Sequence, residues 1–393
     1  MRPHGSASEQ GFRAEVRAWL RDNIPPGLRG SGEDVDLEAA KAWHRRIYEA
    51  GYMGLGWPQE YGGRGLGPAH QFIWQEEYAA AHGPPMVNAI GLGWAGPAIL
   101  LHGTEEQKVR YLPRILDGSE IWCQLFSEPG AGSDLAGLHT RAVPTGDGFV
   151  LNGQKVWTSY ARQADRGICV ARTDPAAPPH RGLSFLLVDM HDPGVEVRPI
   201  RQIDDRSIFN EVFLSDVRVA SSDLVGGLND GWRVTISTLL FERVGLSAGR
   251  GALWGSGPDA VSLVAYLREL GVVRDPVVRD KLSRVLVDAH AHRSLKLRMV
   301  TQAVRGAIPG AEASVQKLFG DEWGQRLCEL AFDAGGPSSH LSRHDPRARA
   351  GGGWQDALLY SRALTIGGGT TEVQKNIIGE RILGLPKEGA RSR

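Results

Sequence analysis

The chain has 393 residues, of which 41% are hydrophobic, and its 45 basic side chains balance 45 acidic ones. This length supports one large or two to three modest hydrophobic cores, and the neutral charge excludes the global positive field that nucleic-acid binding usually needs. The three cysteines form no Cys-x-x-Cys pair, which argues against a disulfide framework and a structural zinc site and agrees with a reducing cytoplasm.

The sequence also predicts a protein that stays out of the membrane. No stretch approaches the roughly 18 consecutive apolar residues of a membrane span, and the first eight residues lack the apolar core of a signal peptide. We therefore expect a cytoplasmic protein with neither a nucleic-acid nor a membrane partner.

The first third of the chain predicts helices. Apolar residues recur at helical spacing from Phe12 to Leu20, and Pro25 and Pro26 end that helix. Further helices are predicted over 37–50, 71–81 and 105–116, the last with Thr104 as its N-cap, and a loop is predicted over 57–63. We expect an N-terminal helical domain over residues 1–118.

From about residue 121 the pattern changes to short β-branched or alternating runs, which predict strands. These runs lie at 149–151, 168–170, 183–188, 195–197 and 212–219. Asn152-Gly153 predicts a hairpin, because a type I′ turn needs two residues that tolerate positive φ. We expect a middle β domain, a barrel or sandwich, over 119–228.

The helical period returns after Gly231 and persists over 277–300 and 313–332. This predicts a C-terminal helical bundle domain over 229–393. The order of helices, strands and helices without alternation indicates an α+β fold with segregated layers rather than a doubly wound sheet.

A first candidate site is the segment from Phe126 to Asp134, at the start of the strand region. Gly130 and Gly132 let backbone amides approach a ligand closely, and the hydroxyls of Ser127 and Ser133 suit a flavin carbonyl and a phosphate. In isolation, a Gly-Ala-Gly segment is more often only a turn.

A second candidate site follows at residues 155–159. Alternation along a strand places Trp157 and Ser159 on one face, where an indole beside a hydroxyl could cover an isoalloxazine ring. The alternative is a tryptophan in the core of the β domain.

A third candidate site lies near the C-terminus, at residues 366–374. Three glycines precede Thr371 and Gln374, a pattern that predicts a backbone cradle leading into a helix with a capping box, and therefore an anion site. The alternative is an ordinary helix start.

These three motifs, with Trp57-Pro58-Gln59-Glu60-Tyr61-Gly62-Gly63 upstream, resemble the acyl-CoA dehydrogenase family over nearly the whole chain. The resemblance implies a helical, a β and a four-helix domain, with FAD between the β domain and the last helices. It also implies the cofactor-binding residues Phe126, Ser127, Gly132, Ser133, Trp157, Ser159, Thr370 and Glu372.

The resemblance also directs the search for the catalytic base. Many family members carry a glutamate where this chain has Gly368, whereas the isovaleryl-CoA and long-chain branches carry it on the first C-terminal helix, directly before an arginine. Glu242 and Arg243 match the second pattern. No basic residue lies three or four positions from Glu242, so we expect a base rather than a helical salt bridge or a solvated surface carboxylate.

The resemblance implies α,β-dehydrogenation of an acyl-CoA or acyl-carrier thioester. Glu242 would take the α proton, FAD the β hydride, and the N–H of Gly368 would polarise the thioester carbonyl. Electron-transferring flavoprotein is the expected electron acceptor. The expected assembly is a homodimer or homotetramer, with a hetero-oligomer as the alternative.

Two other functions stay open on the same fold. One is an acyl-CoA oxidase or flavin monooxygenase. The other is a non-catalytic subunit that completes a partner's FAD site, because residues 270–279 lack the family's Arg-x-x-Phe-Gly segment. The acyl group itself is not predicted.

Overall fold

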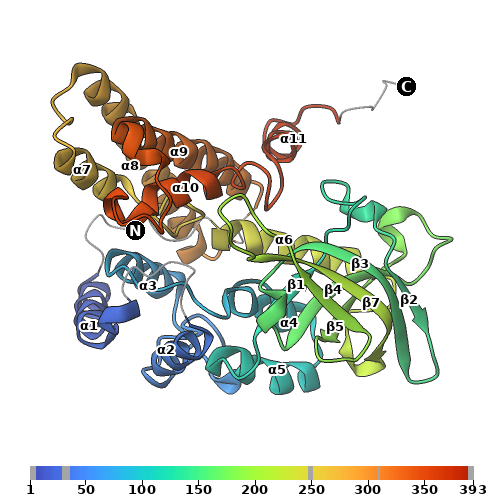
Figure 1. Ribbon diagram of the computed structural model, residues 1–393. Coiled ribbons are helices and arrows are strands. Elements are labelled where there is room, and N and C mark those ends of the chain that lie inside the picture. The colour runs from blue at the N-terminus through green and yellow to red at the C-terminus, as the bar shows by residue number, and fades with distance from the viewer. Residues whose placement is uncertain (1–5, 29–35, 247–250, 308–309, 388–393) are drawn as a thin grey trace. The chain divides into compact units, whose positions relative to one another are not determined.

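The computed structural model describes residues 6–28, 36–246, 251–307 and 310–387 (Figure 1). Two compact units are present. The described residues within 35–66 and 85–242 form one, here called the sheet unit, and those within 1–34, 67–84 and 243–393 form the other, here called the helical unit. Within these ranges every helix is too short or too polar to serve as a membrane span.

The helices of the sheet unit start where the sequence supplies capping side chains. Asp36 caps α2 (Leu37–Glu49) by accepting from the N–H of Ala39, and Thr104 caps α5 (Glu105–Asp117) in a capping box with Gln107. The predicted helices at 37–50 and 105–116 are therefore confirmed. The unit also contains a π turn (Gly91–Ala95), α4 (Gly96–His102) and most of α6 (Gly231–Leu246).

An eight-stranded sheet forms the centre of the sheet unit. Its strand order is β6-β7-β3-β2-β4-β5-β8, and β1 pairs with β4. The strands are β1 (Trp122–Leu125), β2 (Arg141–Pro144), β3 (Gly148–Ser159), β4 (Arg166–Arg172), β5 (Leu183–Asp189), β6 (Val195–Pro199), β7 (Phe209–Ala220) and β8 (Leu224–Val225). All five predicted strand segments lie within these strands.

The hairpin predicted at Asn152-Gly153 is wrong. Both residues lie inside β3, which runs unbroken from Gly148 to Ser159 between β2 and β7. Asn152 exchanges two hydrogen bonds with Asp216 of β7, and a Cβ on Gly153 would come within 2.3 Å of the Thr140 hydroxyl. The asparagine therefore bridges two strands, and the glycine allows close approach rather than a turn.

Two bulges interrupt the pairing of β3 with β7. Between the pairs Leu151↔Val217 and Gly153↔Leu214, β7 carries one extra residue. Between Lys155↔Val212 and Thr158↔Asn210, the extra residue is on β3. Asp216 and Trp157 lie in these intervals with φ of 55° and 60°, the left-handed backbone that a bulge can impose on one residue.

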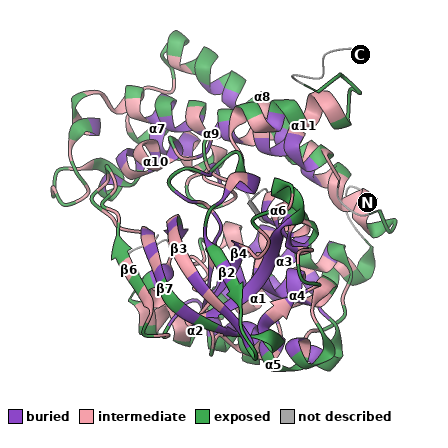
Figure 2. Ribbon diagram, turned by 90° about the vertical axis from the view of Figure 1, so that its right-hand side faces the viewer, coloured by how far each residue is buried: buried purple, intermediate pink, exposed green. Residues whose placement is uncertain are grey.

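The core of the sheet unit is built from the inward residues of β1, β3, β4, β5 and β7, shown in purple in Figure 2. Hydrophobic side chains alternate with exposed ones along β7, as expected for a strand with one buried face. β4 and β5 are instead buried along nearly their whole length.

The helical unit contains the remaining long helices. They are α1 (Ala7–Asn23), α3 (Pro68–Ala80), α7 (Ala260–Glu269), α8 (Pro276–Val304), α9 (Glu312–Gly335), α10 (Gly353–Ser361) and α11 (Thr371–Arg381). Buried side chains of α7, α8, α9 and α10 form its core. The predicted order of helical, sheet and helical parts in an α+β fold is thus confirmed.

Ion pairs connect α1, α3 and α8 within the helical unit. The Arg13 guanidinium contacts Glu76 at 2.8 Å and Glu77 at 2.6 Å, Arg17 contacts Glu77, and Arg293 of α8 contacts Glu76 at 3.0 Å. Both glutamates are buried. They fix the α1 and α3 helices against α8, because a buried carboxylate needs its cationic partners.

Candidate active site

The first candidate segment starts as β1 ends. The ring of Phe126 is buried and meets Phe185 edge-on, with 5.9 Å between ring centroids, so this ring belongs to the core. Glu128 and Ala131 exchange two backbone hydrogen bonds and close a tight turn. Beyond this turn Gly132 and Ser133 are exposed, and a Cβ on Gly132 would meet no atom within 4 Å. The turn thus presents an open backbone at Gly132.

A buried ion pair anchors this segment to β3. The Lys155 ammonium, fully buried, donates to the carbonyl oxygens of Phe126 and Val170 and to Glu128 Oε1 at 2.9 Å. Glu128 also accepts from the backbone N–H groups of His139 and Thr140. All three ammonium protons therefore have acceptors, and the carboxylate has three donors.

The pKa of Glu128 shows which effect dominates. Burial by itself would raise this pKa, but the Lys155 charge and the hydrogen bonds from Thr140, His139 and Lys155 outweigh it and hold the pKa below its ordinary value. Neither residue was predicted to have a role. The available signal was a lysine on the inward face of β3, in phase with the buried Phe149 and Leu151.

The bulge on β3 presents Trp157. This indole is 60% exposed and contacts only Phe209 among the described aromatic rings, in a T-shaped arrangement, whereas Thr158 takes the buried position. The alternative of a core tryptophan is therefore wrong. Ser159 is half-buried, and the backbone N–H of Val156 donates to the carbonyl of Ser127, which joins the first two candidate segments.

The third candidate segment lies in the helical unit. Gly368 and Gly369 have φ of 64° and 88°, a conformation that glycine adopts without strain. The predicted capping box of Thr371 with Gln374 is wrong. Thr370 is the N-cap of α11 and accepts from Val373 N–H, and Gln374 donates instead to the carbonyls of Gly368 and Gly369.

Polar groups at this helix start are available to a ligand. Gln374 Oε1 is buried and has no hydrogen-bond partner among the described residues, whereas Glu372 is exposed. A buried acceptor without a hydrogen-bond partner among the described residues favours a bound donor, such as the hydroxyl and N–H groups that FAD carries. Within the sheet unit, the exposed indole of Trp157 and the open backbone at Gly132 also fit parts of a flavin nucleotide.

Glu242 is buried near the end of α6, with 6% of its surface exposed. Its Oε2 accepts from the side-chain amide of Gln124 on β1, at 3.2 Å. Thr238, one turn earlier, is also buried and donates its hydroxyl to the carbonyl of Val234. The alternative of a solvated surface glutamate is therefore wrong, whereas Arg243 is half-buried.

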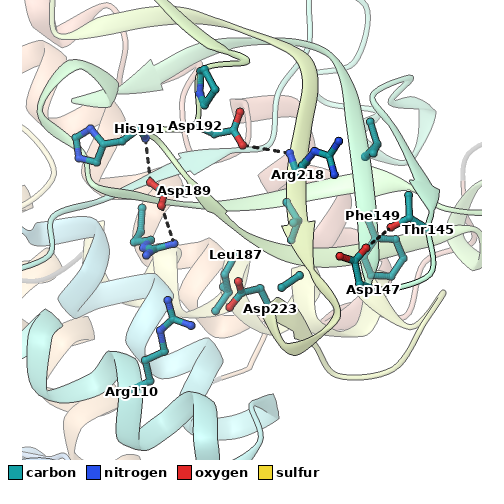
Figure 3. Close-up of a pocket in the computed structure, with 15 residues that line it drawn as sticks. Arg110, Thr145, Asp147, Phe149, Leu187, Asp189, His191, Asp192, Arg218 and Asp223 are labelled. Carbon is teal, nitrogen blue, oxygen red and sulfur yellow. Dashed lines mark hydrogen bonds and ion pairs between the residues drawn. The ribbon is translucent and has the colours of Figure 1, made fainter.

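The sheet unit also contains a cavity of about 590 Å³ on another part of its sheet (Figure 3). Its lining combines Arg110, Arg166 and Arg218 with four aspartates, among which Asp189 accepts from the N–H of His191 and lies 3.5 Å from Arg166. None of the predicted site residues lines it. The cavity is therefore separate from the candidate active site.

Comparison with known proteins identifies the chain. Models of the N-terminal, middle and C-terminal domains of acyl-CoA dehydrogenases match residues 6–119, 123–217 and 229–383. The acyl-CoA dehydrogenase IpdE1 of Mycobacterium tuberculosis is 43% identical over 385 residues, which cover 96% of this chain and 98% of that protein.

Two solved structures are similar over nearly their full length. The Tcur3481-Tcur3483 steroid ACAD is 31% identical with a TM-score of 0.87, covering 99% of this chain and 100% of that one. The ChsE4-ChsE5 complex from Mycobacterium tuberculosis is 31% identical with a TM-score of 0.84 and the same coverage. The chain therefore belongs to the acyl-CoA dehydrogenase family, FAD-dependent enzymes that act on acyl-CoA thioesters.

Proposed function

We propose that Glu242 is the base of this acyl-CoA dehydrogenase. The observation that supports this assignment is the burial of its side chain, because a carboxylate that is sheltered from water is a stronger base than a solvated one. Glycine at position 368 carries no side chain that could do the same work.

The reaction assigns one task to each group. Glu242 takes the α proton of the thioester, and the electrons of that C–H bond form the new α,β double bond as the β hydride leaves. FAD supplies the two-electron acceptor for that hydride. The backbone N–H of Gly368 stabilises the charge that develops on the thioester oxygen.

The family resemblance supports the predicted cofactor-binding residues. Ser127, Ser159 and the indole of Trp157 suit the flavin ring, Gly132 and Ser133 suit a phosphate, and Thr370 and Glu372 would contribute further contacts. Electron-transferring flavoprotein is the acceptor that this family assignment favours over oxygen. An oxidase is the alternative, and rapid reoxidation of the reduced flavin by oxygen would favour it.

We infer that the substrate is the CoA thioester of a bulky, steroid-derived acyl group and that the chain works in a complex with a second, related chain. Support comes from the two similar structures, one described as a steroid ACAD and both named after two different proteins. A hetero-oligomer therefore replaces the homodimer or homotetramer as our preferred assembly. The chain would be its catalytic member, because it carries Glu242.

Replacement of the base tests the central assignment. Glu242→Gln should keep bound flavin but lower kcat for thioester dehydrogenation by about 10²–10⁴-fold, the usual contribution of a positioned base. Glu211→Gln is the matched control, because Glu211 also accepts from a glutamine amide, that of Gln154, at 3.0 Å. Near-normal turnover of Glu242→Gln would remove Glu242 from this role.

Expression with and without a partner tests the assembly. The chain purified alone should be colourless or weakly yellow if a second chain completes its FAD site, and should become yellow and active when the two are produced together. A homo-oligomer that is yellow and fully active by itself would contradict the hetero-oligomer and leave the role of Glu242 intact.

A further inference from the structure

The glycine-rich segment before α11 is held by the side chain of Gln374. This side chain is fully buried near the start of α11, and its amide Nε2 donates to the carbonyl oxygens of Gly368 and Gly369, each at 3.1 Å. An amide NH₂ group has two N–H donors, so both are in use. The amide cannot be turned round, because Oε1 would then face two other acceptors. A Cβ on Gly369 would come within 2.5 Å of Nε2, so this contact requires a glycine.

The same segment presents backbone donors that have no acceptor. Its ends are held by hydrogen bonds from the N–H of Gly367 to the carbonyl of Ala363 and from the N–H of Thr371 to the carbonyl of Thr365. Between these ends, the N–H groups of residues 368–370 donate to no acceptor within the part of the chain that the structure describes. Three successive donors next to a helix start suit an oxygen that carries negative charge.

The contacts of Gln374 determine where these donors point. In a trans peptide the C=O and N–H groups point in opposite directions, so the held carbonyls direct the N–H groups of Gly369 and Thr370 away from Gln374. The peptide that carries the Gly368 N–H lies between one held by Gln374 and one held through the Gly367 N–H. Glycine backbone has no side chain that restricts its rotation. The amide of Gln374 therefore supplies the restraint that the glycines lack.

We propose that Gln374 is the positioning residue of the backbone donors that bind the thioester oxygen. This inference rests on the proposed role of the Gly368 N–H. Donors that are already in place stabilise the developing negative charge without reorganisation, and the loss of one such donor lowers kcat by about 10²–10³-fold. Gln374 acts on these donors through the carbonyls of Gly368 and Gly369, and so keeps a glycine segment in the conformation that the reaction needs.

Gln374→Leu tests the proposal in the co-purified, flavin-loaded enzyme, because it removes both hydrogen bonds and keeps a side chain of similar size. We expect kcat per bound flavin to fall by about 10-fold or more, while the KM for the acyl-CoA thioester changes by no more than about 3-fold. The reason for this difference is that the donors act mainly on the charge that develops during the reaction. An unchanged kcat would overturn the proposal.

Vibrational spectroscopy shows whether the loss arises at the thioester oxygen. The enoyl-CoA product of the assay, labelled with ¹³C at its thioester carbonyl, binds without reacting, and hydrogen bonds to its oxygen lower the C=O stretching frequency. In Gln374→Leu this frequency should move towards its value in free solution. A fall in kcat with an unchanged frequency would mean that Gln374 has only a structural role, and the proposal would be wrong.

Gln374→Glu gives a second test, which depends on one proton. The protonated carboxyl donates one hydrogen bond, whereas the ionised form donates none and repels both carbonyls. At low pH the kcat of Gln374→Glu should therefore exceed that of Gln374→Leu, and the advantage should shrink as the carboxyl ionises. If Gln374→Glu is no more active than Gln374→Leu at any pH, a donor at this position is not what matters and the proposal fails.

Gln107 provides the matched control in the sheet unit. Its buried amide Nε2 also donates to two backbone carbonyls, those of Ser222 and Leu224, at 2.7 Å and 2.9 Å. Gln107→Leu should leave kcat and the carbonyl frequency unchanged. A comparable loss of kcat in Gln107→Leu would mean that the enzyme responds to any lost amide and would overturn the assignment to Gln374. Near-normal turnover of Glu242→Gln would instead count against the proposed base, whatever the result at Gln374.

Discussion

The buried ion pairs compared here, one in each unit, differ in how many hydrogen bonds they make with the backbone. In the sheet unit, Lys155 and Glu128 contact each other and four backbone groups, and the pKa of Glu128 is lowered. In the helical unit, Lys317 and Asp321 also form a buried pair, at 2.6 Å, yet burial outweighs Lys317 and raises the pKa of Asp321 to about 6.

The difference follows from where free backbone groups exist. Glu128 and its partners His139 and Thr140 lie in turns and at strand ends, where N–H and C=O groups are available. Lys317 and Asp321 both lie within α9, whose backbone groups already pair along the helix. The ammonium of Lys317 reaches one carbonyl, that of Leu364. Of these two pairs, only the one whose carboxylate also accepts backbone hydrogen bonds has its acid held in the ionised form.

Two more buried groups on α8 follow the pattern of the helical unit. Burial, with the charge of Lys296, lowers the pKa of His292 to about 3. Burial also lowers the pKa of Lys296 to about 8, although the charge of Glu76 acts in the opposite direction. Both groups are pushed towards their neutral forms.

The largest expected effect comes from breaking the pair in the sheet unit. Lys155→Met should lower the free energy of unfolding by about 3–5 kcal/mol, because it leaves a buried carboxylate and two buried carbonyls without their donor. Flavin content should also fall, since Lys155 holds the carbonyl of Phe126. Denaturant unfolding and flavin absorbance measure both. Lys281→Met, at an exposed lysine, is the control and should change neither.

The equivalent change in the helical unit should lower the free energy of unfolding by less. Lys317→Met should lower the free energy of unfolding by about 2 kcal/mol near pH 7, because Asp321 can take up a proton instead of staying charged. Its pKa is already raised and rises further without Lys317. In the folded variant Asp321 therefore takes up a proton as the pH falls, and the loss in the free energy of unfolding relative to the wild type should shrink towards about pH 5. A deficit as large as that of Lys155→Met would contradict the comparison.

A third prediction concerns the acid side of the stability curve. The pKa of His292 is lower in the folded chain than in the unfolded one, so the unfolded chain binds the extra proton between about pH 6.5 and 3, and stability falls as the pH falls. His292→Gln removes this loss. Relative to the variant, the wild type should lose about 2 kcal/mol between about pH 7 and pH 5. His290→Gln, at an exposed histidine of the same helix, should leave the curve unchanged.

The smallest effect tests a helix end whose cap the sequence placed one residue too late. Thr370→Ala should lower the free energy of unfolding by about 1 kcal/mol, the usual value of an N-cap, whereas Thr371→Ala should have little effect. Thermal unfolding of the two variants gives the comparison directly. The reverse order would restore Thr371 as the cap.

Local patterns predicted the fold well because the apolar residues of a helix or a strand recur at short, regular spacing along the sequence. Thr104 was predicted as the N-cap of α5, and the apolar runs predicted the strands. Asn152-Gly153 misled because its local signal for a turn was overridden by pairing with β7 and by the close approach of Thr140.

The candidate site was predictable only in part. Glu242 was found through its resemblance to a known pattern, and its burial is consistent with the expected role. Its contact with Gln124, and the contact of Lys155 with Glu128, join residues far apart in sequence, which no spacing rule reveals. In a single sequence, the one usable clue is a polar side chain at an inward or apolar position.

The two bulges between β3 and β7 have a consequence for the rest of the sheet. The first bulge adds a residue to β7 and the second adds one to β3. The two shifts cancel, so the pairing returns to its original register at Thr158 and Asn210. The bulge that exposes the Trp157 indole is therefore local, and the strand pairing beyond it is unchanged. Two bulges that cancel in this way change the backbone around Trp157 while the strand pairing on either side keeps its register.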